Sequence, residues 1–577
     1  MRKHNLSALV LIFALVVLQP AASLHAQRRR GAAASAPASA ASTPARRAAE
    51  LIMAEELRAY LTFVASDEME GRDTPSRGLD LTAKFLAMNL ALWGAKPAGD
   101  NGTFFQRIAL RREKLNAEQS RLELNGRVFD PSDYLFAEAR AGTASGNLVY
   151  GGHGWLVKSK NIDALKDIDV RDKVVILLGG GLPPGVTFAD LSAGKPGVDW
   201  SYPVANAQQK GARGVVYVPG FQVMSNWEKS RQNVLKNTKL TVERFADSGF
   251  ALTGAETKIP SAIISTSVLN ALFEKEKASG AEIMRRTLAN EPGDSFALDA
   301  NKKITLTVGT TVETMTTQNV VAVIEGSDPA LKNEYVALGA HYDHVGRGTT
   351  DPSQGRGPHP DGKAEDDIWN GADDDGSGTV ALLALAKALA TGPARPKRSI
   401  LFVWHAGEEK GLWGARYFTE NPTVPLNQIV TQLNIDMIGR SKKEGDTKPQ
   451  NTNLSGPNEV YVIGSKMMST SLGELSERVN KSYLNLNFNY KYDDPKDPEK
   501  FFFRSDHYHY AQKGIPIIFY FSGVHEDYHR PSDSPDKIDY AKMEKVARTV
   551  FMMAWETADL AARPRVDKPL PTELTEK

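Results

Sequence analysis

Glu408 and Glu409 form an adjacent pair of carboxylates directly after the apolar segment 400–404. Two neighbouring carboxylates at the tip of a buried strand repel each other and resist losing their water. A metal ion would relieve both costs, because one carboxylate can bind the metal while the other acts as a base toward metal-bound water. Such a pair on its own more often marks a solvated turn between a strand and a helix, so its interpretation depends on the surrounding motifs.

Further candidate metal ligands follow apolar, strand-like segments or lie in turns: His341, Asp374, Asp436 and His529. Asp374 is the middle acid of a glycine-flanked turn, 371–378, that opens a helix. A helix N-terminus favours negative charge and can support one acid, but three consecutive acids indicate a cation as well.

Two imidazoles and three carboxylates suit two divalent ions that share one bridging carboxylate. Mixed nitrogen and oxygen ligands favour zinc, although Co²⁺ or Mn²⁺ is also compatible because ligand type does not settle the metal. Asp343, Asp373 and Asp375 could each replace a neighbour in this ligand set. A calcium turn formed by residues 373–375 alone is a competing interpretation, but it leaves the histidines unexplained.

Strands and helices alternate from Thr305 onward, which predicts an α/β fold with a doubly wound, mainly parallel sheet and helices on both faces. The expected strands cover residues 319–324, 335–340, 399–404, 429–435, 460–463 and 515–521, and the principal helices cover 377–390 and 542–560. Sites in open α/β sheets lie at the carboxyl ends of the strands, where the candidate ligands fall.

The motifs resemble those of the co-catalytic zinc aminopeptidases, a family that includes glutamate carboxypeptidase-like and transferrin-receptor-like proteins. The segments that carry the resemblance are Gly339-Ala340-His341-Tyr342-Asp343, residues 371–378, residues 407–414, Asp436-Met437-Ile438-Gly439 and Tyr528-His529. The resemblance covers the chain from Asn319 to the last helix, together with the opening segment 66–72. Five motifs in the family order make chance agreement improbable, whereas each alone is weak.

The resemblance implies that His341 and Asp436 bind one zinc ion, that Glu409 and His529 bind the other, and that Asp374 bridges the two. Glu408 would be the general base that takes a proton from the bridging water and later donates it to the leaving amine. Asp343 would lie behind His341 and tune the metal.

Tyr528 is a candidate hydrogen-bond donor to the oxyanion of the tetrahedral intermediate, with a packing role as the alternative. Asp506, in a segment that also resembles the family, is a candidate contact with substrate. His405 departs from the family pattern, in which a small or hydroxyl residue is expected, and it is predicted to be structural. His344 and His359, in or beside the Gly- and Pro-rich loop 345–369, are predicted to be loop residues and not ligands.

The remaining chain divides by composition. Residues 1–26 have the pattern of a secretory signal peptide, and 27–48 of a disordered linker. Residues 49–121 and 300–562 would form the two parts of the catalytic domain. Residues 563–577 would form a C-terminal tail without a predicted fold. Residues 122–299 resemble the protease-associated domain, which implies a non-catalytic, inserted β-rich α/β domain; its single histidine, His153, is no catalytic candidate.

The formal net charge of +1 provides no basic surface for nucleic acid, and the chain has no cysteine for disulfides. No second segment is long and apolar enough to span a membrane once the signal is removed.

The predicted protein is an exported metallo-aminopeptidase, located in a bacterial periplasm or outside the cell, that acts on peptides with a free N-terminus. A carboxypeptidase or a glutaminyl cyclase of the same fold is the alternative, and a non-catalytic, receptor-like binding protein a less favoured one; the oligomeric state stays open.

Overall fold

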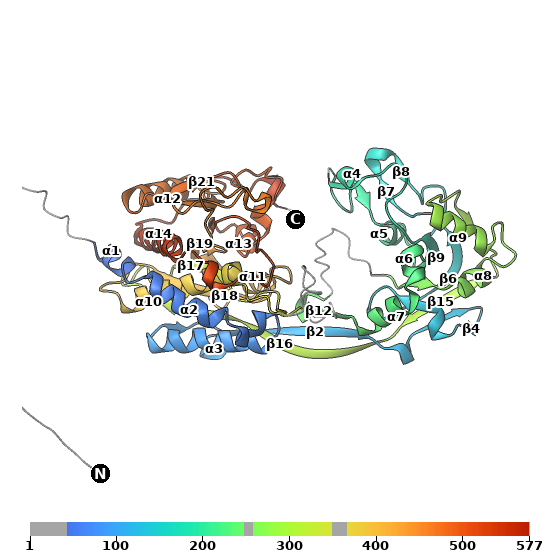
Figure 1. Cartoon of the computed structure of the whole chain (residues 1–577), viewed down its shortest axis with the longest axis horizontal. Coiled ribbons are helices and arrows are strands. Elements are labelled where there is room, and N and C mark those ends of the chain that lie inside the picture. Colours follow the sequence, from blue (N-terminus) through green and yellow to red (C-terminus); the bar gives the residue numbers. More distant parts are fainter. Residues whose placement is uncertain (1–42, 193, 247–257, 349–365, 576–577) are drawn as a thin grey trace, which may run out of the picture. The chain divides into compact units, whose positions relative to one another are not determined.

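The computed structural model describes residues 43–192, 194–246, 258–348 and 366–575 (Figure 1). The predicted signal peptide, residues 27–42 of the predicted linker, and His359 lie outside these residues. None of the helices in the described ranges combines the length and the apolar character needed to cross a membrane.

The main sheet has the strand order β12-β2-β16-β18-β17-β19-β22-β20-β21, with β1 paired to β16. Its strands are β1 (Lys96–Pro97), β2 (Phe105–Leu115), β12 (Thr238–Val242), β16 (Thr310–Ile324), β17 (Tyr335–His341), β18 (Ser399–His405), β19 (Ile429–Ile435), β20 (Glu459–Ile463), β21 (Asn487–Asn489) and β22 (Ile517–Phe521). The run β18-β17-β19-β22 is parallel, whereas β16 and β20 join it in antiparallel orientation. The sheet is therefore mixed, and its parallel part is the centre that carries the candidate ligands.

Helices cover both faces of this sheet and confirm the predicted α/β class. One core holds side chains of α1 (Pro44–Ala49), α2 (Ala54–Val64), α3 (Arg77–Leu92), α10 (Gly378–Thr391), α12 (Thr470–Ser482) and α14 (Tyr540–Asp559). The core of the opposite face includes side chains of α11 (Trp413–Glu420) and α13 (His507–Gln512). Every residue of β18 is buried, because a strand at the centre of such a sheet is covered on both faces.

The insert, which runs from β3 to β15, has its own sheet in the order β4-β3-β15-β6-β9-β11-β13-β5, with β14 paired to β6. These strands are β3 (Arg121–Leu124), β4 (Arg127–Val128), β5 (Tyr134–Phe136), β6 (Gly142–Tyr150), β9 (Val174–Leu178), β11 (Gly214–Val218), β13 (Ser261–Ile264), β14 (Phe296–Ala297) and β15 (Lys303–Val308). A small separate sheet contains β7 (Leu156–Val157), β8 (Ile162–Asp163) and β10 (Trp200–Ser201).

The helices of the insert are α4 (Phe188–Ser192), α5 (Pro203–Gln209), α6 (Phe221–Ser225), α7 (Trp227–Lys236), α8 (Thr266–Leu272) and α9 (Gly280–Ala289). Because β15 pairs with β3 and β6, the sheet of the insert extends past the boundary predicted at residue 299. One strand of the intervening chain, β12, pairs instead with β2 of the main sheet.

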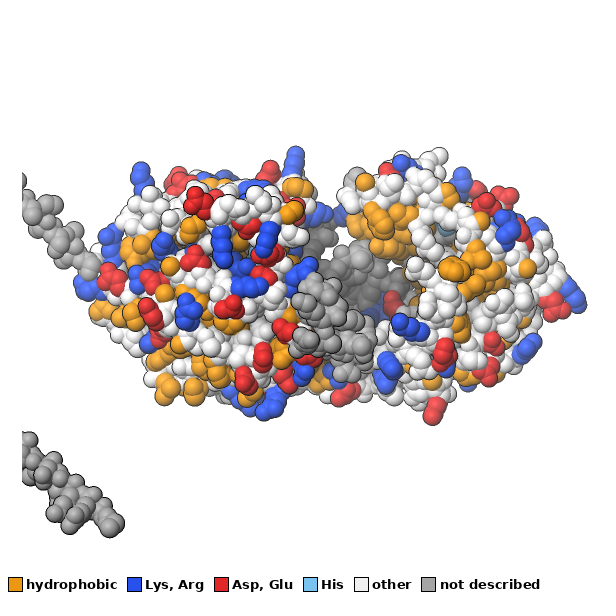
Figure 2. All heavy atoms as spheres, in the orientation of Figure 1, with side chains coloured by type: hydrophobic (Ala, Val, Ile, Leu, Met, Phe, Trp, Pro, Cys, Tyr) orange, Lys and Arg blue, Asp and Glu red, His pale blue; other side chains and the backbone are white. Residues whose placement is uncertain are grey.

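Both ends of the described chain pack against the part that contains the main sheet. The helix α1 begins inside the predicted linker, and Ala45, Ala48 and Ala49 are buried in the first core. Small alanine side chains allow this close packing, so their abundance does not mean disorder here. Leu574, in the predicted tail, is buried in the second core. On the face drawn in Figure 2, basic and acidic side chains are interspersed, in keeping with the small net charge.

Candidate metal centre

Three adjacent parallel strands bring candidate ligands to one edge of the main sheet. His341 is the last residue of β17, Glu408 and Glu409 follow β18, and Asp436 follows β19. The order β18-β17-β19 places their carboxyl ends side by side. Side chains separated by almost a hundred residues in sequence therefore meet above a single edge, as expected for an open α/β sheet.

Asp374 lies between two groups of candidate ligands. Its Oδ1 is 3.3 Å from Nε2 of His341, and its Oδ2 is 3.0 Å from Nε2 of His529. Each oxygen of this one carboxylate thus faces a different histidine, which is the arrangement that a bridging ligand between two metals needs.

The first group combines His341, Asp436 and Asp375. Nε2 of His341 is 3.7 Å from Oδ2 of Asp436. Asp375 accepts hydrogen bonds through Oδ1 from the main-chain N–H groups of Gly378 and Met437, at 2.9 and 3.1 Å. Asp375 therefore joins the acidic turn to the end of β19, in addition to lying close to the other two side chains.

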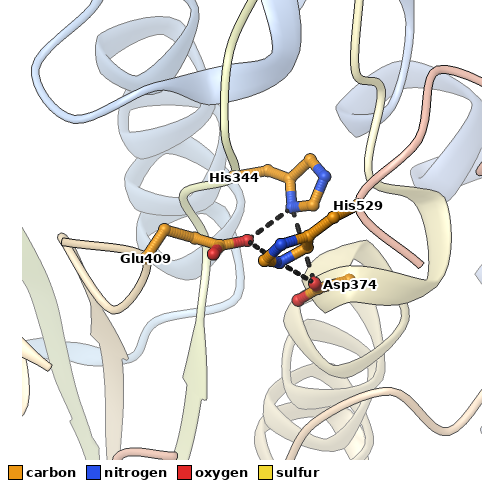
Figure 3. A group of neighbouring side chains, drawn as sticks. All are labelled: His344, Asp374, Glu409 and His529. Atoms are coloured by element: carbon orange, nitrogen blue, oxygen red, sulfur yellow. Dashed lines mark ion pairs between the residues drawn. The ribbon is translucent and has the colours of Figure 1, made fainter. Parts of the chain in front are cut away.

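The second group combines Asp374, Glu409, His529 and His344 (Figure 3). Nε2 of His529 and Nδ1 of His344 lie 3.0 and 2.8 Å from Oε1 of Glu409. Sequence reasoning assigned His344 to the loop; the structure instead buries its side chain among the candidate ligands. No periodic pattern reveals this position, and the short spacing from His341 was the one signal available.

Glu408 and Glu409 have opposite electrostatic environments. Burial raises the pKa of Glu408 well above its usual range; the Glu409 and Asp436 carboxylates raise it further, and His341 opposes them. Burial and Asp374 would also raise the pKa of Glu409, but His529 and His344 lower it to about 2. One carboxylate of the pair is therefore strongly ionised, whereas its neighbour has a high affinity for a proton.

Glu408 also lines a hollow at this edge of the sheet, together with Asp374, Asp436 and Tyr528. The ring of Tyr528 stacks on that of His529 at a centroid distance of 4.0 Å, and its hydroxyl accepts a hydrogen bond from Arg504. The other lining residues are mostly apolar: Met437, Phe501, Phe519, Phe521 and Val524, with Arg504 the charged exception. A molecule bound in the hollow would therefore contact both the candidate ligands and an apolar wall.

Asp343 and Asp506 take supporting positions behind the ligands. Nδ1 of His341 is 3.1 Å from the main-chain oxygen of Asp343 but 3.7 Å from its carboxylate, so the closer contact is with the backbone. Asp506 is buried with Oδ2 3.3 Å from Nδ1 of His405. His405 is in turn 3.0 Å from the hydroxyl of Tyr510, and these contacts agree with the structural role predicted for it.

Two buried side chains hold the segments that carry the ligands. Arg72, at the end of a short helical turn (Asp67–Arg72), donates hydrogen bonds to the main-chain oxygens of Val64, Tyr342, Asn370 and Gly371. Asp533 accepts hydrogen bonds through Oδ2 from the main-chain N–H groups of Asp373 and Asp374. Sequence reasoning missed both functions, because their partners are backbone atoms of distant segments.

The chemistry of these donors fits divalent metal ions. Among the described residues, Oε1 of Glu409, Oδ2 of Asp375 and both ring nitrogens of His344 are buried without a hydrogen-bond partner. An unpaired buried carboxylate oxygen is costly, and a cation would satisfy it. Imidazole nitrogens and carboxylate oxygens in two neighbouring groups, with Asp374 close to a histidine of each, are compatible with zinc.

Comparison with known proteins agrees with this chemistry. Residues 319–554 match the model of Peptidase family M28, which confirms the predicted family for this part of the chain. A probable leucine aminopeptidase of Trichophyton verrucosum is 28% identical over 238 residues, or 40% of this chain and 56% of the relative. A probable leucine aminopeptidase 2 of Aspergillus oryzae is 31% identical over 227 residues, covering 38% of this chain and 36% of the relative. The chain thus spans about half the length, or less, of these relatives.

Two solved structures also resemble the chain. An aminopeptidase from Aneurinibacillus sp. strain AM-1 covers 91% of this chain and 98% of its own, with 17% identity and a TM-score of 0.46. A zinc aminopeptidase from Bacillus subtilis covers 91% of this chain and 99% of its own, with 16% identity and a TM-score of 0.43.

Proposed function

We propose that this protein is an exported, dinuclear zinc aminopeptidase that removes N-terminal residues from peptides. The single observation that carries the proposal is the position of Asp374, whose two carboxylate oxygens face His341 and His529. His341 and Asp436 would hold one zinc ion, and Glu409 and His529 the other. Zinc ions bound there would lower the pKa of a water molecule and polarise the scissile carbonyl.

Glu408 is the general base in this proposal. It lines the hollow beside Asp374, and burial gives it a high affinity for a proton. Its carboxylate takes a proton from the attacking water and transfers that proton to the leaving amine. Glu409, with its lowered pKa, stays ionised as a ligand and cannot share this function.

Tyr528 is the proposed donor to the developing oxyanion. Burial raises the pKa of its phenol, followed by the charges of Asp374 and Glu409, so the hydroxyl keeps its proton at neutral pH. A protonated phenol at the wall of the hollow can donate a hydrogen bond to an oxyanion.

The walls of the hollow favour an apolar first residue in the substrate. Met437, Phe501, Phe521 and Val524 would surround that side chain and would offer a charged one little solvation. Relatives named leucine aminopeptidase agree with this preference. Export rests on the signal-like composition of residues 1–26, and the family resemblance of the insert supports a protease-associated domain.

A peptide library with free N-termini, compared with the same library after N-acetylation, tests the proposal. Metal content is measured on the same sample. We expect stepwise release of N-terminal residues from the free library, none from the blocked library, and two zinc ions per chain. Cleavage of blocked peptides at internal bonds, release of C-terminal residues, or pyroglutamate as the product would refute the aminopeptidase assignment.

A further inference from the structure

His344 has a position that the structure determines through backbone hydrogen bonds. Its main-chain N–H donates to the oxygen of Arg72 at 3.1 Å, and the N–H of Gly346 donates to the oxygen of Gly71 at 3.0 Å. Arg72 is itself held by four main-chain oxygens around the centre. Residues 344–346, which follow β17, are therefore held in place by backbone hydrogen bonds to residues 71 and 72.

Gly371 makes room for the imidazole of His344. A Cβ atom at Gly371 would lie 2.4 Å from Cγ and 2.5 Å from Cδ2 of His344, closer than side chains tolerate. The φ angle of Gly371 is 57°, a left-handed conformation that glycine adopts without strain. A residue with a side chain at this position would displace the ring, so the acidic turn and the histidine are fitted to each other.

The ring of His344 has no hydrogen bond that explains its burial. Its side chain is fully buried, and neither ring nitrogen has a hydrogen-bond partner among the described residues. Nδ1 lies 2.8 Å from Oε1 of Glu409, but that pair does not have the geometry of a hydrogen bond. Buried polar groups are nearly always satisfied, so two unpaired nitrogens in one ring require an explanation.

The nitrogen and oxygen atoms of His344, Asp374, Glu409 and His529 lie close enough together to surround one ion, all within 4.8 Å of one another. Nδ1 of His344 is 2.8 Å from Oε1 of Glu409 and 3.8 Å from Oδ2 of Asp374. Nε2 of His529 is 3.0 Å from each of the same two oxygens. Zinc with bonds of about 2.0–2.2 Å in tetrahedral geometry places its ligand atoms roughly 3.3–3.6 Å apart. Three of the four distances given above are shorter than this range and one is longer. Figure 3 shows the four side chains converging.

We propose that His344 is a fourth protein ligand of the metal that Asp374, Glu409 and His529 would bind. The inference rests on the proposed function only in assuming that metals bind here. It makes the two sites unequal, because this site would have two imidazoles, whereas the site of His341 and Asp436 would have one. The richer site fills first and releases its ion last, and it favours zinc or cobalt over magnesium or calcium.

A test compares the full-length wild type with His344→Ala and His344→Gln, using zinc alone as the probe. Chelator competition measures the affinity of each site, and X-ray absorption of the protein loaded with one equivalent of zinc counts the histidines bound. We expect two histidines in the wild type and one in either variant. The affinity of the tighter site should fall at least tenfold, while the weaker site changes less than threefold.

Glutamine separates ligation from packing, because its amide is a polar side chain that still occupies the buried position but is a poor ligand for zinc. Full affinity in His344→Gln, or an unchanged histidine count, would overturn the proposal. His153→Ala, in the insert, is the matched control and should leave both affinities unchanged. If the alanine variant does not fold, the glutamine variant carries the test. The zinc affinities and the number of bound histidines are measured without substrate. If the protein were not an aminopeptidase, the peptide libraries would show it, whereas the number of histidines bound to zinc would not change.

Discussion

The main-chain N–H of Glu408 donates a hydrogen bond of 3.1 Å to Oδ1 of Asp343. Asp343 also lies beside His341, whose Nδ1 is 3.7 Å from the same oxygen. Burial raises the pKa of Asp343 to about 7, and Glu409 raises it as well, against the lowering effect of His341. The residue behind the first ligand therefore also positions the proposed base, so the geometry of metal binding and that of proton transfer are linked.

Replacement of Glu408 by Gln should abolish most turnover without loss of metal. The amide keeps the shape of the side chain but cannot accept a proton, and general-base catalysis contributes roughly 10²–10⁴-fold in rate. The measurements are kcat on a free-amine dipeptide and zinc content per chain. Glu409→Gln is the matched control, which should lose zinc as well as activity. Near-normal kcat in Glu408→Gln would refute the assigned role.

Replacement of Arg72 by Met should destabilise the metal-free protein by about 3 kcal/mol or more. The change leaves four main-chain oxygens without their donor and removes a buried positive charge near Asp343 and Asp374. Urea unfolding of the apo-protein measures the loss.

Arg548→Met serves as the control for Arg72→Met, because Arg548 also donates to a main-chain oxygen, that of Ile52, but is only partly buried. It should cost less than about 1 kcal/mol. Equal losses in the two variants would show that Arg72 has no special structural role.

Replacement of Val524 by Trp should change substrate preference more than overall activity. A larger side chain would fill the hollow and exclude a leucine side chain, whereas alanine at the substrate N-terminus would still fit. We expect the ratio of kcat/KM for Leu over Ala peptides to fall roughly tenfold or more, since a single methylene group in an apolar pocket can change such a ratio by about tenfold. Val566→Trp, at an exposed position, should leave the ratio unchanged. A Val524 variant with the wild-type ratio would place the leucine pocket elsewhere.

His507 should make the protein sensitive to acid. It is fully buried, stacks on Phe519 at 4.5 Å, and burial lowers its pKa to about 3. In the unfolded chain this histidine has a pKa of about 6.5, so it binds a proton at a pH at which the folded protein keeps it neutral. The stabilisation of the folded protein by neutral His507 is therefore complete above about pH 6.5 and is lost as the pH falls toward 3.

His507→Phe removes that titration. Between pH 7 and pH 4 the free energy of unfolding of the apo-protein should fall about 3 kcal/mol more in the wild type than in the variant. Urea titrations at several pH values, in the presence of a chelator to exclude effects of metal release, measure the free energy of unfolding of both proteins. The same change of this free energy with pH in both proteins would contradict the prediction.

Local sequence determined the elements and most candidate ligands. The apolar segments around β17, β18 and β19 predict buried strands, and topology places the last residue of each strand and the first few residues after it at one edge of the sheet. His341, Glu409 and Asp436 could be predicted for this reason. Glu408 could be singled out because two adjacent carboxylates after a buried strand are costly without a cation.

Only the tertiary structure decided which groups meet across long separations. His344 lies three residues after β17 in a segment without periodicity, and its place depends on hydrogen bonds to Gly71 and Arg72 and on the room left by Gly371. Arg72 likewise acts through main-chain oxygens of segments some 270–300 residues away, and backbone oxygens leave no trace in residue types. Residue type and spacing therefore determined which side chains could bind a metal, whereas packing of distant backbone segments decided that His344 lies among them.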